Sequence, residues 1–306
     1  MSTNAIQSSH IYSTYFAPRG RIYTLGMQIA QLYLSPFDQI IGFIGEAGSG
    51  KSVLIKGMFP GIELTNDDDG VNVRPLPLLE QEYETGFFTP HTYHLDIRFE
   101  TGFHQLSELA DAVRLAVRRG KRIIIEHFDL IYPLLGVNAN LLIGVGEQIV
   151  ITRPNLFGPL PQELCDIVYP SLAYRLMAHS AEDLCEYAMT QEQMLACSHG
   201  DIRHGFVLEF NEHQPDIDIP TLEARVNELI RQDLPIDYYD ESHILLGGAQ
   251  HYCTGPRTHV RSTGRIIGFR LLDHFIYDHF HKTYMLVGCV GDDSEENIRK
   301  LETIHG

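Results

Sequence analysis

The chain has 306 residues, enough for one large domain or two ordinary ones, and its hydrophobic content of 44% and charged content of 21% are those of a globular protein. The formal net charge of −17 argues against broad electrostatic binding to DNA or to an anionic membrane. No apolar run approaches bilayer length, and the five scattered cysteines favour reduced thiols, so we expect a cytoplasmic protein that does not enter a membrane.

The first elements in chain order surround an apolar run at residues 40–44, which predicts a buried strand. Before it, residues 21–34 alternate loosely and fit either a strand or a short helix. After it, residues 53–56 favour a helix. Phe59-Pro60-Gly61 then breaks the chain before residues 62–65, which predict a second short strand.

The same alternation continues through the middle of the chain. Residues 91–99 alternate like a strand, and residues 106–119 have the apolar spacing of an amphipathic helix that Gly120 ends. Residues 122–126 are an apolar run suited to a buried parallel strand, and residues 146–152 predict another strand. Alternating strands and helices predict an α/β fold, a three-layer domain built from βαβ units.

The later part of the chain has a different pattern. Residues 170–194 favour a helix, with a proline suited to its first turn, and residues 222–232 favour another. Residues 239–291 are rich in Gly, His and β-forming residues. We therefore place a boundary near residue 200, between an α/β domain in residues 1–200 and a smaller α+β domain in residues 201–306.

A complete phosphate-binding loop motif directly follows the strand at residues 40–44. Its eight residues are Gly45, Glu46, Ala47, Gly48, Ser49, Gly50, Lys51 and Ser52. The glycines let the backbone curl so that successive N–H groups face phosphate oxygens. In this motif Lys51 would reach the terminal phosphates and Ser52 would bind Mg²⁺, so we expect a nucleoside triphosphate site.

Phosphoryl transfer also needs carboxylates that hold Mg²⁺ or orient the nucleophile. Glu126 ends the apolar run at residues 122–126, where a Walker-B acid would project beside the loop, and Asp129 is the alternative. Asp68 and Asp69 lie in an acidic cluster after the expected second strand, where a carboxylate could act as a base. The same cluster also suits a plain turn.

Together, the loop motif, a strand followed by aspartates and the Ile-Ile-Ile-Glu126-His-Phe-Asp segment resemble the uridine kinase and phosphoribulokinase group of P-loop kinases over residues 38–130. The resemblance implies a Mg²⁺- and ATP-dependent transferase in which one of Asp67, Asp68 and Asp69 is the base. The segment typical of an arginine-rich lid is missing, so ATP hydrolysis remains an alternative. No Asn-Lys-x-Asp motif is present, which favours ATP over GTP.

Residues 251–268 resemble the second additional domain, the editing domain, of alanyl- and threonyl-tRNA synthetases. The matching residues are Cys253, Gly255, Pro256, His259, Val260, Thr263 and Gly264. The resemblance implies that Cys253 and His259 contribute to a metal site. The nearest histidines that could complete a Zn²⁺ site are His243 and His251, although packing or substrate contact would also explain such residues.

This second resemblance leads to two further hypotheses about the function. The chain could be a nucleotide-gated module that binds tRNA or another ligand, or a trans-editing hydrolase that acts on aminoacyl-tRNA. Arg257 and Arg261 could contact an RNA end or another anion, and the alternative is a solvated basic loop. A small-molecule phosphate acceptor is the partner that the kinase reading implies.

Overall fold

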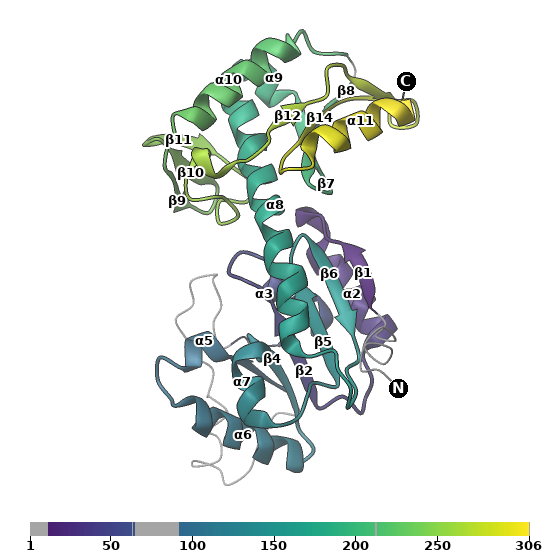
Figure 1. Cartoon of the computed structure of the whole chain (residues 1–306), viewed down its shortest axis with the longest axis vertical. Coiled ribbons are helices and arrows are strands. Elements are labelled where there is room, and N and C mark those ends of the chain that lie inside the picture. Colours follow the sequence, from purple (N-terminus) through teal and green to yellow (C-terminus); the bar gives the residue numbers. More distant parts are fainter. Residues whose placement is uncertain (1–11, 63, 65–91, 212, 306) are drawn as a thin grey trace. The chain divides into compact units, whose positions relative to one another are not determined.

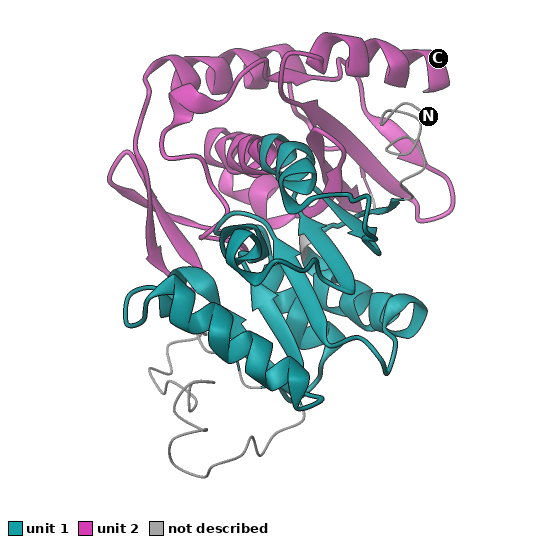
Figure 2. Ribbon diagram, turned by 60° about the horizontal axis from the view of Figure 1, so that its bottom comes forward, with its two compact units in different colours: residues 1–171 teal, residues 172–306 magenta. Residues whose placement is uncertain are grey.

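The computed structural model describes residues 12–62, 64, 92–211 and 213–305. The chain divides into two compact units, Met1–Ser171 and Leu172–Gly306, which Figure 2 shows in teal and magenta. The division falls inside helix α8 (Pro161–Ala188), so it comes earlier in the chain than residue 200, where the composition changes. The change in composition falls within a strand, Cys197–Ile202, whereas the change in packing occurs in the middle of a helix.

Unit 1 is built on one mixed sheet (Figure 1). Its strands, in spatial order, are β1 (Ser13–Phe16), β6 (Gln148–Thr152), β5 (Leu141–Val145), β2 (Ile40–Ile44), β4 (Arg122–Glu126) and β3 (Thr92–Asp96). The strands β5, β2, β4 and β3 are parallel, and β6 pairs antiparallel with both β5 and β1, so β1 runs in the same direction as β5. The expected α/β class is therefore confirmed.

Helices cover both faces of this sheet. One apolar core joins the sheet to α2 (Ile22–Tyr33) and α3 (Lys51–Met58), and the other joins it to α6 (Leu106–Arg118), α7 (Phe128–Leu135) and the first part of α8. Strand β4 shows the alternation, because Ile124 packs in the first core while Ile123 and Ile125 pack in the second. A short helix, α5 (Ile97–Glu100), directly follows β3, and a 3₁₀ turn at Arg19–Arg21 precedes α2.

Several expected elements differ from the observed ones. Residues 21–34, which fitted either element, form the helix α2. Residues 62 and 64 are not in a strand, and the rest of the expected strand at 62–65 includes positions outside the described residues. The strand expected at 91–99 ends at Asp96, and α8 begins at Pro161, so that Pro170 lies inside the helix.

Unit 2 combines helices with two antiparallel sheets, as expected for an α+β region. The first sheet contains β7 (Cys197–Ile202), β8 (Gly205–Asn211), β14 (Thr283–Cys289), β12 (Arg270–Leu271) and β13 (Ile276–Asp278). The second contains β9 (Ile236–Asp240), β10 (His243–Leu246) and β11 (Ala249–Tyr252). The helices are the second part of α8, α9 (Gln191–Leu195), α10 (Ile219–Arg231) and α11 (Ser294–His305), with a 3₁₀ turn at Thr263–Arg265.

The second part of α8 lies in the main core of unit 2. Ala181, Leu184 and Cys185 of this helix pack against α10 and both sheets. Helix α11 packs on a separate, smaller apolar cluster with β14. Over the residues that the structure describes, no helix combines the length and apolar character needed to cross a bilayer.

Candidate functional sites

The phosphate-loop motif forms a tight turn between β2 and α3. Gly48 and Gly50 have φ angles of 77° and 89°, in the left-handed region that glycine adopts without strain. A Cβ atom at Gly45 would lie 2.5 Å from the carbonyl oxygen of Val145. Gly50 is the N-cap residue of α3, so the free backbone N–H groups of the first helical turn adjoin the loop. The fold thus requires glycine at these positions of the motif.

A pocket of about 320 Å³, here called the loop pocket, opens beside this turn. It is lined by Ala47, Gly48, Ser49, Gly50, Lys51, Ser52, Val53, Asp96, Arg98, Phe99, Glu126 and His127. These residues come from the loop and from the carboxyl ends of β3 and β4, and ligands of open α/β sheets bind at such ends. The loop, the expected lysine and serine, and Glu126 therefore meet at one place.

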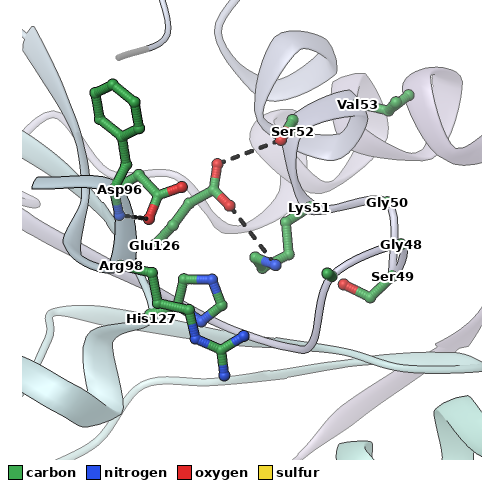
Figure 3. A pocket seen from close by; sticks show the side chains of 12 residues that line it. Gly48, Ser49, Gly50, Lys51, Ser52, Val53, Asp96, Arg98, Glu126 and His127 are labelled. Atoms are coloured by element: carbon green, nitrogen blue, oxygen red, sulfur yellow. Dashed lines mark hydrogen bonds and ion pairs between the residues drawn. The ribbon is translucent and has the colours of Figure 1, made fainter. Parts of the chain in front are cut away.

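Glu126 connects the two functional side chains of the motif (Figure 3). Its Oε1 accepts a long hydrogen bond of 3.4 Å from Ser52 Oγ, and its Oε2 lies 3.7 Å from Lys51 Nζ. Lys51 Nζ also donates to the carbonyl oxygen of Glu46 at 3.0 Å. Strand β4 is directly hydrogen-bonded to β2, which is why the acid at its end reaches the loop.

Strand β3 adds two side chains that the sequence analysis did not assign to the site. His94 Nε2 lies 3.1 Å from Glu126 Oε1 and donates to it, because the carboxylate can only accept. Asp96 is the register partner of Glu126, and its Oδ1 accepts from the backbone N–H of Phe99, which caps α5. The carboxylates of Asp96 and Glu126 lie near each other in Figure 3.

Arg98 is the pocket's arginine. It is the second residue of α5, and it makes two hydrogen bonds to the Glu46 carboxylate, at 2.9 Å and 3.2 Å. Both side chains are partly exposed, at 43% and 42%. The loop pocket therefore has a guanidinium group at its rim, a group suited to phosphate.

Burial and neighbouring charges shift the pKa values in the loop pocket. Burial lowers the pKa of Lys51, and the charges of Glu126 and Asp96 oppose this shift. Burial alone would raise the pKa of Glu126, but the hydrogen bond from His94 and the charge of Lys51 hold it below its usual value. Burial, together with Lys51, lowers the pKa of His127 to about 4, so this imidazole is neutral at pH 7.

His127 also has an uncommon backbone. Its φ of 56° places a non-glycine residue in the left-handed region, at the N-cap of α7, and its side chain is buried with no hydrogen-bond partner for Nδ1 among the described residues. Such strain and unsatisfied polar atoms gather at functional sites. The position follows Glu126 directly and lines the pocket.

The acidic residues expected at the site from the sequence differ in whether the structure places them at the loop pocket. Glu126 lines the loop pocket, whereas Asp129 lies in α7 and is not among the lining residues. Asp68 and Asp69 lie outside the described residues. Asp96 is the carboxylate at the end of the first described strand after α3. The signal that could have found it is a carboxylate at a strand-to-helix junction, where it also caps the helix.

Unit 2 contains a second candidate site, here called the α8 cluster, which consists of His179, Asp183, Cys253 and His259. Their ligand atoms all lie within 4.8 Å of one another. Cys253 Sγ is 3.3 Å from His179 Nε2 and 3.6 Å from His259 Nε2, which in turn lies 2.6 Å from Asp183 Oδ2. His179 and Asp183 are one helical turn apart on α8 and so share a face.

The chemistry of this cluster fits Zn²⁺. Two imidazoles, a thiol and a carboxylate are ligands that zinc accepts, and four of them complete a tetrahedral shell. His179 Nδ1 lies 3.1 Å from the buried Glu182 carboxylate, which leaves Nε2 facing Cys253. A carboxylate behind a histidine is the usual support of a zinc ligand. His259 Nδ1 is buried without a hydrogen-bond partner among the described residues.

The structure places the four expected zinc ligands in different groups. Cys253 and His259 both belong to the α8 cluster, whose ligand atoms lie within 4.8 Å of one another. His243 does not, because its Nδ1 contacts the Asp240 carboxylate at 2.9 Å. His251 groups instead with Asp183 and Glu186. The other two members of the α8 cluster are His179 and Asp183, and the signal for them was a His-x-x-x-Asp pair inside an expected helix.

A pocket of about 380 Å³, here called the arginine pocket, adjoins the α8 cluster through His259. It is lined by Ile236, Asp237, Tyr238, Pro256, Arg257, His259, Val260 and Arg261. The guanidinium of Arg257 lies 4.8 Å from the centre of the Tyr238 ring, a cation–π distance. An anionic ligand could therefore lie beside the α8 cluster.

Comparison of the chain with protein-family models and with curated proteins finds no match to either.

Proposed function

We propose that unit 1 binds a nucleoside triphosphate with Mg²⁺ in the loop pocket, as a P-loop NTPase domain, and that the protein transfers or hydrolyses the terminal phosphate. The observation that carries this proposal is the convergence of Ser52, Lys51 and Glu126 at the phosphate-loop turn. A P-loop hydroxyl and an acid on the neighbouring strand are the pair that holds Mg²⁺ in such enzymes. Mg²⁺, when bound, neutralises charge on the β- and γ-phosphates.

Each group in the loop pocket would have its own role in phosphate binding or phosphoryl transfer. The loop backbone and the first turn of α3 bind the phosphates, and Lys51 exchanges its bond to the Glu46 carbonyl for a phosphate oxygen. His94 fixes the orientation of the Glu126 carboxylate by its hydrogen bond. Asp96 is placed to accept a proton from an attacking hydroxyl group or water. Arg98 adds positive charge where negative charge accumulates.

ATP is the nucleotide that we favour, because the sequence lacks a guanine-reading Asn-Lys-x-Asp motif. The strand order, in which the strand of Glu126 pairs directly with the loop strand, fits the resemblance to the uridine kinase and phosphoribulokinase group. The choice between kinase and ATPase depends on the acceptor. Release of ADP that requires an added acceptor would identify a kinase, ADP release without one an ATPase, and binding without turnover a nucleotide-gated module.

The test of nucleotide binding is Lys51→Ala, with Lys56→Ala in the same helix as the matched control. We expect Lys51→Ala to weaken ATP binding, measured by titration calorimetry with Mg²⁺, by roughly 100-fold, since a hydrogen bond to a charged group at a buried site contributes about 1.5–3 kcal/mol. Lys56→Ala should bind ATP like the unmodified protein. Normal ATP affinity in Lys51→Ala would refute the proposal.

A second function is favoured by the α8 cluster and the arginine pocket beside it. We propose that unit 2 is a zinc-dependent site that acts on an anionic substrate, with the 3′ end of an aminoacyl-tRNA as the substrate that the editing-domain resemblance suggests. Zn²⁺ can polarise a carbonyl group or activate water. Arg257 and Arg261 line the adjoining pocket and can bind phosphate.

Deacylation of aminoacyl-tRNA by the full chain tests this second proposal. We expect activity that Cys253→Ser abolishes and that Cys289→Ser, a buried cysteine on β14, retains. If no aminoacyl-tRNA is hydrolysed or bound by a zinc-loaded chain, the editing function is excluded. Zinc content, measured on the same samples, separates loss of the metal from loss of the reaction.

A further inference from the structure

A second group of metal-ligand residues lies one turn further along α8. It consists of Glu186, Cys197 and His199, here called the β7 cluster, and their ligand atoms lie within 4.8 Å of one another. Cys197 and His199 are two residues apart on β7, so their side chains project from the same face of the strand. Glu186 belongs to α8, and its Oε1 forms an ion pair with His199 Nε2.

The β7 cluster places a buried carboxylate against an imidazole. Glu186 is 5% exposed, and its Oε1 contacts His199 Nε2. A buried carboxylate needs a positive partner or hydrogen-bond donors, and a divalent cation bound among the three ligand groups would supply that positive charge.

His251 links the β7 cluster to the α8 cluster. Its side chain is 7% exposed, and its Nε2 lies 3.7 Å from Glu186 Oε2, beyond hydrogen-bonding distance. This Nε2 has no hydrogen-bond partner among the described residues. The ligand atoms of Asp183, Glu186 and His251 also lie within 4.8 Å of one another. Asp183 thus belongs to one cluster and Glu186 to the other, and His251 is within reach of both.

The two clusters therefore adjoin each other, and the residues that α8 contributes to them lie in one row on the helix. Positions 179, 183 and 186 are separated by four and three residues, the spacing of one helix face. All three side chains are buried, at 2%, 3% and 5% exposure. A helix that buries an imidazole and two carboxylates in this way needs compensating cations or partners at each level.

We propose that Glu186, Cys197 and His199 bind a second divalent cation of the zinc class, beside the cation of the α8 cluster, with the buried His251 Nε2 available to it. A thiolate, an imidazole and a carboxylate suit Zn²⁺ over Mg²⁺ or Ca²⁺. The three residues of the cluster leave one position of a tetrahedral shell, which His251 would fill in a closed structural site and which water or substrate would fill in a reactive one. This inference concerns unit 2 alone and does not depend on nucleotide binding.

A different reading of the same three residues is a cysteine nucleophile with His199 as its base and Glu186 as the orienting acid. The metal site is favoured because the buried His251 Nε2, which has no hydrogen-bond partner among the described residues, groups with Glu186 and would complete a set of ligands. A nucleophile, base and orienting acid would leave this nitrogen without a role. The nucleophile reading becomes an outcome of the test below.

The test is a count of zinc per chain by native mass spectrometry on the full-length protein, stripped with a chelator and dialysed against Zn²⁺. We expect two equivalents for the unmodified protein, one for Cys197→Ser and for His199→Gln, and one for Cys253→Ser. The matched controls Cys289→Ser and His274→Gln, which lie outside both clusters, should keep two. The zinc that remains in each single variant shows that unit 2 is still folded.

Cobalt substitution gives an independent readout, because a cobalt–thiolate bond has its own absorption band. Cys197→Ser and Cys253→Ser should each remove part of this band, and the double variant should remove all of it. One zinc per chain that is lost only in Cys253→Ser would overturn the proposal. So would rapid alkylation of Cys197 in the zinc-loaded protein, which would identify a free nucleophile.

Discussion

The loop pocket of unit 1 and the α8 cluster of unit 2 are assembled from the sequence in different ways. In unit 1, six consecutive residues of the phosphate-loop motif, at positions 47–52, make up half of the lining of the loop pocket. In unit 2, the ligands come from a helix and a loop, with His179 and Cys253 separated by 74 positions. A site made by one backbone turn can be recognised from its own residues, whereas a site made by tertiary packing becomes visible only when the packing is known.

Both sites contain buried charged side chains, with Lys51 and Glu126 at 6% and 3% exposure, but the loop pocket also has an exposed rim. The loop pocket is partly open, and its Arg98–Glu46 pair is more than 40% exposed on each side. His179 and Asp183 of the α8 cluster are 2% and 3% exposed. A phosphate ligand that must enter and leave needs the first arrangement, and a resident metal suits the second. The predictions below test whether the two sites act as independent centres, beginning with the largest expected effect.

Removal of the metal should destabilise unit 2 and leave the loop pocket intact. Structural zinc sites contribute on the order of 10 kcal/mol to folding, so a chelator should lower the melting temperature of the metal-loaded protein substantially. Cys253→Ser should lose the part of this chelator sensitivity that comes from the α8 cluster and keep the part that comes from the β7 cluster, and Lys51→Ala should keep both parts. Scanning calorimetry with and without chelator measures both. Equal chelator sensitivity in Cys253→Ser and the unmodified protein would show that the α8 cluster holds no stabilising metal.

Asp96→Asn should separate turnover from nucleotide binding in the loop pocket. General acid–base groups contribute roughly 100- to 10,000-fold to rate, so we expect phosphate release or transfer to fall at least 100-fold while ATP affinity changes little. Asp111→Asn, on the exposed face of α6, is the matched control. Steady-state ADP release gives the rate. If turnover persists in Asp96→Asn but is lost in Asp68→Asn or Asp69→Asn, the base lies in the acidic cluster, as the sequence suggested.

Asp38→Asn should affect unit 1 through stability alone. Its buried carboxylate accepts two hydrogen bonds from Arg153, at 2.7 Å and 2.9 Å. Burial alone would raise the pKa of Asp38, but the contacts with Arg153 and Ser35 hold it below the usual value. Because breaking such a pair costs about 3 kcal/mol, urea unfolding at pH 7 should show a loss of this size.

The pH dependence gives a further check on Asp38. A lowered pKa in the folded state means that its contribution is present above about pH 4, the unfolded value, and is lost as the pH falls through the folded value. The difference between Asp38→Asn and the unmodified protein should therefore shrink in urea titrations at pH 3. A difference that stays constant between pH 7 and pH 3 would show that the ionised carboxylate is not its source. Zinc content should be unchanged in Asp38→Asn.

A site residue could be predicted from the sequence when local backbone geometry or the end of a strand fixes its position. The glycines of the loop are dictated by local backbone geometry, so their spacing alone indicated the turn. Glu126 was predicted because a buried parallel strand ends there. Asp96 was missed because residues 91–99 alternate throughout, although the strand ends at Asp96 and α5 begins at Ile97. Alternation cannot locate such an end when the first helical turn is also partly apolar.

The α8 cluster of unit 2 shows more clearly what could not be predicted from the sequence. Cys253 and His259 were predicted from a run of residues, and nearby His243 and His251 were chosen by closeness in sequence. The structure instead joins Cys253 and His259 to a helix that precedes them by more than 70 positions. No local pattern fixes which helix face meets which loop, since packing of apolar residues such as Leu184 and Val260 decides it.

The contact between Arg98 and Glu46 would make the proposed nucleotide binding an exchange of partners. In the described state the guanidinium is already occupied by a carboxylate of the loop itself, so an incoming phosphate has to compete with an internal anion. The measured affinity then reports the difference between two ion pairs. A triphosphate carries more negative charge and more acceptor oxygens than a diphosphate, so it would displace Glu46 from Arg98 more favourably. By competing for Arg98, Glu46 would thus lower the affinity for the diphosphate product more than the affinity for the triphosphate and favour release of the product.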